Sequence, residues 1–266
     1  MSQRQQPPAD NSLAVRLNRW ALGWSKRWLT IILLLIGLYA GLPVLAPILM
    51  KLGATSIASG IYTIYSGTCH QLAYRSWFLF GEQSAYPRLA AQLPNFVPYE
   101  AFVEEITKSV PPPAGYTGDT QLSRQAQLFV GDEQMGYKVA ICQRDVAIYW
   151  ALFAGGLIFS IPTVRRHLRP VPWWLYVILG LVPIGIDGFS QLLSQPLPGL
   201  LNQPLFPLRE TSPILRTVTG ALFGLMNAWL AFPYLEESSR EVKTEIQAKF
   251  DKRDERERRK RQQEEN

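Results

Sequence analysis

The residues of this chain that could do chemistry are two cysteines, one histidine, and a set of arginine, aspartate and glutamine side chains beside uncharged segments. Thiolate and imidazole groups bind metal ions, and paired thiols form disulfides. Arginine binds carboxylate or phosphate oxygens bidentately, and a neighbouring aspartate orients it or acts as a base. The set is Cys69, His70, Gln71, Arg75, Cys142, Arg144, Asp145, Asp187, Gln191, Arg209 and Arg216.

Long uncharged segments must position these residues. Of the 266 residues, 47% are hydrophobic, yet charge is absent from 28–50 and crowds into 236–265. A helix of about 20 apolar residues crosses the hydrocarbon layer of a bilayer. Spans are predicted at 28–50, 146–164, 173–193 and 213–235. The pattern excludes a soluble enzyme and predicts an all-α, polytopic membrane helix bundle of about four transmembrane helices.

The placement of Lys and Arg predicts the orientation of the bundle. Five basic residues lie in 1–27, three in 165–169 and ten in the tail from 236 onward, whereas the loop 194–212 holds only Arg209. Cytoplasmic flanks carry the excess of basic residues in membrane proteins. Both termini are therefore predicted to lie in the cytoplasm, with the protein in the plasma membrane.

A further uncharged segment, 52–69, has two interpretations. Its Gly, Ser and Thr content makes it a weak inserter, and a fifth span here would turn the basic cluster 165–169 outward. We expect a helix that lies at, or dips into, the outer interface. A fifth span is the alternative.

Three regions are predicted along the chain. Residues 1–27 form a basic, amphipathic cytoplasmic segment, because apolar and basic residues occupy different faces of a helix. Residues 28–235 form the membrane domain, interrupted by an external insertion at about 81–138 that is either a small subdomain or a long loop. Short helices are predicted in this insertion near 99–109 and 121–130.

The third region is the charged cytoplasmic tail, 236–266. It has ten basic and ten acidic residues, which is typical of a solvated helix with ion pairs or of a disordered segment. The mixed signs argue against a nucleic-acid partner. The expected partners are the lipid bilayer and, as an open alternative, a protein that binds the tail.

Helix geometry brings the reactive residues to one level. At a rise of 1.5 Å per residue, Asp187 stands about 21 Å above the cytoplasmic start of its span, and Gln191 lies one turn further out. Arg216 lies about 28 Å above the cytoplasmic end of the last span. Cys69 and Cys142 flank the outer ends of neighbouring segments. A single polar layer is predicted at the outer face.

The two cysteines leave three states open. Both are predicted to face outward, where disulfides persist, so a disulfide between Cys69 and Cys142 is the favoured interpretation. Free thiols, and thiols that bind a metal ion together with His70, are the alternatives. Because adjacent Cys and His are poorly spaced for one metal ion on a helix, no metal or other cofactor is assigned.

Asp187 also has two interpretations. A charge at mid-membrane costs about 2.5–3.5 kcal/mol on insertion scales, so an intramembrane acid indicates function by default. The alternative is a structural ion pair with Arg216 or Arg144 that fixes helix packing. The two interpretations are compatible.

Small residues predict how two spans pack. Gly155-Gly156 in the second span and Gly220-x-x-x-Gly224 in the last permit close approach of helix backbones. These positions favour a compact helix bundle around the polar layer.

Two blocks of motifs resemble a known family. The blocks are Cys69-His70-Gln71, Arg75-Ser76-Trp77-Phe78 and Cys142-x-Arg144, followed by Pro183-x-x-x-Asp187-Gly188-x-x-Gln191 and Arg209-x-x-x-x-x-x-Arg216-x-x-x-Gly220. In this order they resemble the prokaryotic integral membrane protein family called domain of unknown function 2085. The resemblance, over about 62–224, implies a multi-span fold and these site residues but no activity. Many members have Cys where this chain has Asp145, which weakens any thiol or metal site carried over from them.

Three functions from different classes fit these residues. The first is a polar site at the outer membrane face that binds an anionic headgroup or a metal ion. The second is a non-enzymatic scaffold held by the Cys69–Cys142 disulfide and an Asp187–Arg216 pair. The third is a small ion or proton transporter that uses Asp187. No motif ranks an enzyme above these, and the substrate stays open.

Overall fold

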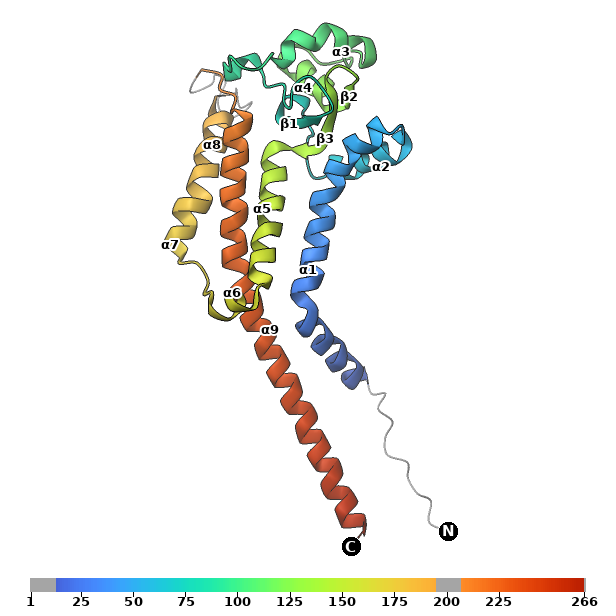
Figure 1. Ribbon diagram of the computed structural model, residues 1–266, viewed down its shortest axis with the longest axis vertical. Coiled ribbons are helices and arrows are strands. Elements are labelled where there is room, and N and C mark those ends of the chain that lie inside the picture. Colours follow the sequence, from blue (N-terminus) through green and yellow to red (C-terminus); the bar gives the residue numbers. More distant parts are fainter. Residues whose placement is uncertain (1–12, 195–206, 266) are drawn as a thin grey trace.

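Long helical segments run lengthwise through the molecule, as a computed structural model that describes residues 13–194 and 207–265 shows (Figure 1). They are α1 (Leu13–Lys51), α5 (Gln143–Ser160), the run from α7 (Trp173–Leu175) to α8 (Val182–Leu193), and α9 (Pro213–Glu265). The start of α1 and the end of α9 lie at one end of the molecule. A small mixed unit lies at the other end.

Among the described residues, three helices are long and apolar enough to cross a membrane: Val15–Lys51, Trp173–Leu193 and Pro213–Glu264. Their surfaces carry exposed leucines, such as Leu34 and Leu38 on α1, as lipid-facing helices do. The predicted membrane helix bundle is therefore confirmed. The count of four spans stays a prediction, because α5 begins with a polar turn and is not among the three.

The helix predicted at 146–164 ends early. In the structure α5 stops at Ser160, Ile161 is extended, and α6 (Pro162–His167) begins at Pro162. The reason is local, because the residue before a proline is disfavoured in the helical region. The tail after residue 235 is helical as far as Glu265, which matches the helical alternative for that segment.

Glycines set the contact between α5 and α9, which pack against each other more extensively than any other helices described. A Cβ atom on Gly220 would lie 2.6 Å from the carbonyl oxygen of Arg144, and one on Gly155 would lie 2.5 Å from Cβ of Ala228. Gly224 approaches the Ile148 carbonyl in the same way. The close backbone approach that these glycines permit thus occurs between α5 and α9, and it fixes the height of Arg144 against α9.

The segment between α2 and α5 folds into a cap, which we define as residues 70–142. A three-stranded antiparallel sheet forms its base, in the order β1 (Ser76–Leu79), β3 (Gly136–Cys142), β2 (Gly131–Asp132). The helices α3 (Val103–Ser109) and α4 (Gly118–Leu128) agree with those predicted near 99–109 and 121–130. The sheet was not predicted, so "all-α" describes the bundle but not the cap.

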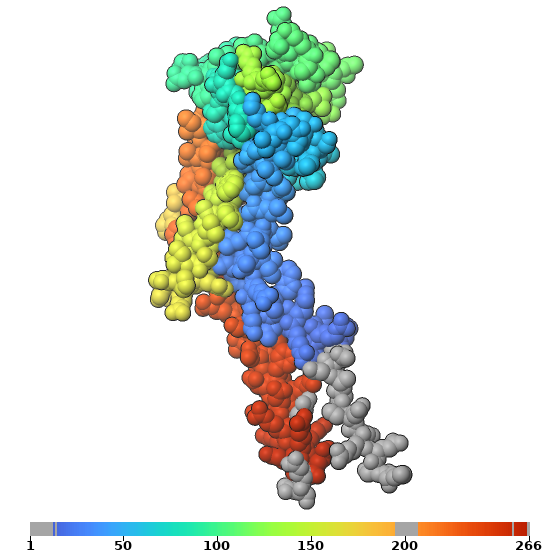
Figure 2. All heavy atoms as spheres, turned by 45° about the vertical axis from the view of Figure 1, so that its right-hand side comes forward, coloured from blue at the N-terminus to red at the C-terminus, as the bar shows by residue number. Residues whose placement is uncertain are grey.

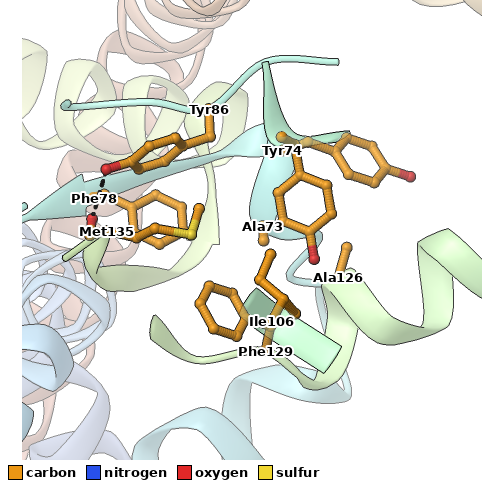
Figure 3. Close-up of a cluster of buried hydrophobic side chains, with 9 residues drawn as sticks. Ala73, Tyr74, Phe78, Tyr86, Ile106, Ala126, Phe129 and Met135 are labelled. Atoms are coloured by element: carbon orange, nitrogen blue, oxygen red, sulfur yellow. Dashed lines mark hydrogen bonds between the residues drawn. The ribbon is translucent and has the colours of Figure 1, made fainter. Parts of the chain in front are cut away.

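Aromatic side chains form the core of the cap (Figure 3). Tyr86 packs edge-to-face on Phe78, and its hydroxyl donates a hydrogen bond to the carbonyl oxygen of Met135 at 3.1 Å. Ile106 from α3 and Ala126 from α4 are fully buried against this cluster. The cap therefore has a hydrophobic core of its own, which distinguishes it from a long loop.

The uncharged segment 52–69 contains α2 (Thr55–Ser66), which has 12 residues. A helix of that length is too short to cross a bilayer, since about 20 residues are required. It packs against α1 and β3 beside the cap (Figure 2) while Ile57 and Ile64 stay exposed. The length of α2 argues against a fifth span, and its place at the membrane interface stays a prediction.

Candidate functional site

A polar pocket lies where the cap meets the ends of α5, α8 and α9. Its cavity has a volume of about 310 Å³. The lining residues are Thr68, Cys69, His70, Gln71, Leu72, Arg75, Cys142, Arg144, Asp145, Gln191 and Arg216. All the predicted site residues line it except Asp187 and Arg209, and these two contact its walls. The structure thus brings the predicted residues together around one pocket.

Asp187 sits behind the pocket wall on α8, with 2% of its surface exposed. Its carboxylate forms an ion pair with Arg144 and accepts a hydrogen bond from the Thr211 hydroxyl at 2.8 Å. Nη2 of Arg209 lies 3.7 Å from Oδ1, the same oxygen that accepts from Thr211. The predicted pair between Asp187 and Arg216 is wrong, and the alternative partner Arg144 is the one the structure selects.

Arg216 has a different partner because Glu210, a residue that the sequence did not single out, lies between the cap and α9. Glu210 forms an ion pair with Arg216 and accepts two hydrogen bonds from Arg75, from Nε at 2.9 Å and from Nη2 at 3.0 Å. Burial opposes the charge on Arg75, but the Glu210 carboxylate outweighs burial and raises the pKa of Arg75. A signal for Glu210 did exist, since it is the one acidic residue in the sequence 194–212.

The pocket carries excess positive charge. Arg75 and Arg216 share Glu210, while Arg144 and Arg209 share Asp187. Four guanidinium groups thus surround two carboxylates, and Asp145 on the opposite wall is the remaining acid. One positive charge is left uncompensated when all three acids are ionised.

Two buried hydrogen-bond donors at the pocket have no acceptor within the part of the chain that the structure describes. They are Nε of Arg144 and Nε2 of Gln191. Gln191 is 6% exposed, so bulk water does not readily satisfy its amide. Buried donors without partners are uncommon and costly. Both groups belong to residues that line the same cavity.

The opposite wall of the pocket holds the two thiols. The backbone N–H of Cys142 donates to Sγ of Cys69 at 3.3 Å, and the Cys142 thiol donates to Oδ2 of Asp145 at 2.9 Å. Both cysteines are free thiols in this structure, and their Sγ atoms lie within 4.8 Å of each other, so the disulfide stays a prediction. The interaction between the two thiol side chains lowers the pKa of Cys69, against burial, whereas the same interaction and burial both raise the pKa of Cys142. Cys69 is therefore the thiol that ionises first.

A buried lysine outside the predicted set supports this wall. Lys138 on β3 is fully buried, and its Nζ donates to the carbonyl oxygens of Gln71, Ala126 and Gln127 at 2.7, 3.2 and 2.8 Å. Burial lowers the pKa of Lys138 to about 7, although the nearby Cys69 opposes the shift. A lysine in a strand pattern reads as a solvent-facing residue, so its sequence context carried no signal for this role.

Comparison with known proteins gives a family match that covers part of this pocket. Residues 133–230 match the profile of a family described as Predicted membrane protein (DUF2085). This is the family that the motifs resemble. The matched segment contains the pocket residues from Cys142 to Arg216, while the turn that carries Cys69 and His70 lies before it.

A relative extends the similarity over most of the chain. An uncharacterised protein of Methanocaldococcus jannaschii is 24% identical over 195 residues, which cover 71% of this chain and 80% of the relative. No solved structure matches significantly. The resemblance to DUF2085 is confirmed together with its membrane character, and neither comparison names an activity.

Proposed function

We propose that the protein binds an anionic, phosphate-bearing group in the pocket between the cap and the helix bundle. The observation that carries the proposal is the pair of buried donors, Nε of Arg144 and Nε2 of Gln191, that lack acceptors in the described residues. A phosphate oxygen would accept from both. The uncompensated guanidinium charge favours an anion over a neutral ligand, because charge-assisted hydrogen bonds are the stronger ones. The cavity of about 310 Å³ accommodates a headgroup-sized ligand.

Gln191→Leu is expected to weaken phosphate binding about tenfold, because it removes one donor to a charged oxygen while keeping the volume of the side chain. Binding of inorganic phosphate to the purified full-length protein in detergent is measured by calorimetry at constant ionic strength. Gln247→Leu, on the exposed part of α9, is the matched control and should bind as the wild type does. Wild-type protein that does not bind phosphate, or a Gln191→Leu variant of unchanged affinity, contradicts the proposal.

The phosphate group has two sources, a lipid headgroup and a free phosphate compound. Nanodiscs that contain phosphatidylglycerol compete with inorganic phosphate if the headgroup is the ligand, and nanodiscs of neutral lipid do not. Competition by neither nanodisc, with phosphate still bound, assigns the site to a soluble phosphate compound. Binding to neither ligand leaves the scaffold interpretation, in which the ion pairs only fix the helices.

We also propose that both termini are cytoplasmic and that the pocket opens at the outer face of the plasma membrane. The described ends of α1 and α9 lie at the same end of the molecule, opposite the cap, which supports an even number of crossings (Figure 1). Trypsin is therefore expected to remove the basic tail in inverted vesicles and to leave it intact in sealed right-side-out vesicles. Cleavage in the right-side-out vesicles would contradict this orientation.

A further inference from the structure

Three potential metal ligands lie together on the thiol wall of the pocket. The Sγ atoms of Cys69 and Cys142 and a carboxylate oxygen of Asp145 all lie within 4.8 Å of one another. In a tetrahedral zinc site with Zn–S bonds of about 2.3 Å, ligand atoms are about 3.5–3.8 Å apart. The three atoms are therefore close to the spacing that one ion requires, and small side-chain rotations complete it.

The fold dictates this spacing. Cys142 ends β3 and is the N-cap residue of α5, while Asp145 is the third residue of that helix. The side chains of an N-cap residue and of the third helical residue face each other across the first turn. The turn after α2 brings Cys69 against the same helix start, where the Cys142 amide donates to its sulfur.

The backbone around Cys69 can stabilise a thiolate through hydrogen bonds. Gln71 adopts a left-handed conformation with φ of 51°, which aims its N–H at Sγ of Cys69 at 3.5 Å. Two backbone amides thus donate to one sulfur, an arrangement that stabilises metal-bound thiolates. Two hydrogen bonds fix Gln71 in turn. Its side-chain amide donates to the carbonyl oxygen of Tyr62, and Nζ of Lys138 donates to the backbone carbonyl oxygen of Gln71.

We propose that Cys69, Cys142 and Asp145 bind one divalent ion of the zinc class, with the fourth coordination position open to the pocket. Two thiolates select zinc over magnesium or calcium, which prefer oxygen ligands alone. Three protein ligands with one open position are typical of zinc sites that bind a water molecule or a substrate. His70, though adjacent in sequence, is exposed and is not one of the three ligands.

The open position faces the cavity that the arginines line. If the proposed function holds, the ion would coordinate an oxygen of the bound phosphate group and the arginines would bind the others. This last step rests on the proposed function, whereas the metal site does not. Metal content and phosphate affinity are separate measurements, so either proposal can fail alone.

Elemental analysis of the full-length protein, purified under reducing conditions, loaded with zinc chloride and dialysed, tests the site. About one zinc ion per chain is expected in the wild type and in the control Asp251→Asn, which alters an exposed acid of the tail. Cys69→Ser, Cys142→Ser and Asp145→Asn should each lower the zinc content at least tenfold. Wild-type protein without zinc, or a Cys69→Ser/Cys142→Ser double variant that retains it, would overturn the proposal.

A variant that gains a metal ligand tests the site even if the variants that lose a ligand fail to fold. Asp145→Cys supplies a third thiolate, so it should retain zinc, and its cobalt-substituted form should show a thiolate-to-cobalt charge-transfer band about one half stronger than the wild type. A band that does not strengthen contradicts the assignment of Asp145. A disulfide-linked Cys69–Cys142 peptide as the main species in protein purified without reductant would show that the thiols serve a structural bond instead.

Discussion

Lys138→Met is expected to lower the stability of the cap by about 3 kcal/mol or more, because it leaves three buried carbonyl oxygens without a donor. The nitrogen of Lys138 joins the carbonyl of Gln71 to those of Ala126 and Gln127 in the last turn of α4. Carbonyls at a helix C-terminus have no intrahelical partner and need a hydrogen-bond donor from elsewhere. The substitution is therefore expected to destabilise both α4 and the turn that carries Cys69.

The expected fall in melting temperature is on the order of 10 °C, measured by scanning fluorimetry of the purified protein in detergent. Trypsin should also cut within 81–138 earlier than in the wild type. Lys108→Met is the matched control, because Lys108 is exposed and pairs only with Glu105 on its own helix among the described residues. Equal melting temperatures for the two variants would show that Lys138 does not hold the cap.

The same lysine predicts a pH dependence. Its pKa is lowered by burial to about 7 in the folded protein, against about 10.4 in an unfolded chain. Between these values the unfolded chain binds the extra proton, so stability rises with pH in this window and is level below it. The difference in melting temperature between wild type and Lys138→Met should widen from pH 7 to pH 9. A difference that narrows as pH rises would contradict the lowered pKa.

The sequence predicts well what depends on periodicity and depth. Helix rise alone placed Asp187 and Gln191 at the level of Cys142, and Gln191 and Cys142 line the same pocket. The glycines predicted close helix packing because a missing Cβ acts locally, and the structure shows this packing between α5 and α9. These inferences need only the geometry of a single helix, which is fixed by the backbone hydrogen bonds.

Partner choice was harder to predict. Arg216 lies within reach of Asp187 by depth, but Glu210 is nearer in the fold, and it competes successfully because it also joins Arg75 of the cap. The role of Lys138 could not be predicted from the sequence, because its hydrogen-bond acceptors come from segments that meet only through tertiary contacts. The sheet was not predicted because its strands are short. The strand β2, for example, has two residues.

Asp187→Asn is expected to lower the folded abundance of the protein strongly, with a cost of about 3 kcal/mol or more. The substitution leaves the guanidinium of Arg144 without its counter-ion in a buried site, and removing one partner of a buried pair costs about 3–5 kcal/mol. Asp187 on α8, Arg144 on α5 and Thr211 before α9 meet at this carboxylate, so the loss also separates three elements. Abundance is measured by fluorescence-detected gel filtration of the solubilised membrane fraction.

A second substitution identifies the true partner of Asp187. Arg144→Gln added to Asp187→Asn should restore part of the lost abundance, because it removes the charge that was left unpaired. Arg216→Gln should restore nothing, since Arg216 pairs with Glu210 and its removal opens a second defect. Rescue by Arg216→Gln would reinstate the pair that helix depth suggested. Normal abundance of the single Asp187→Asn variant would instead mean that this carboxylate is held for a ligand and is not a support for the helices.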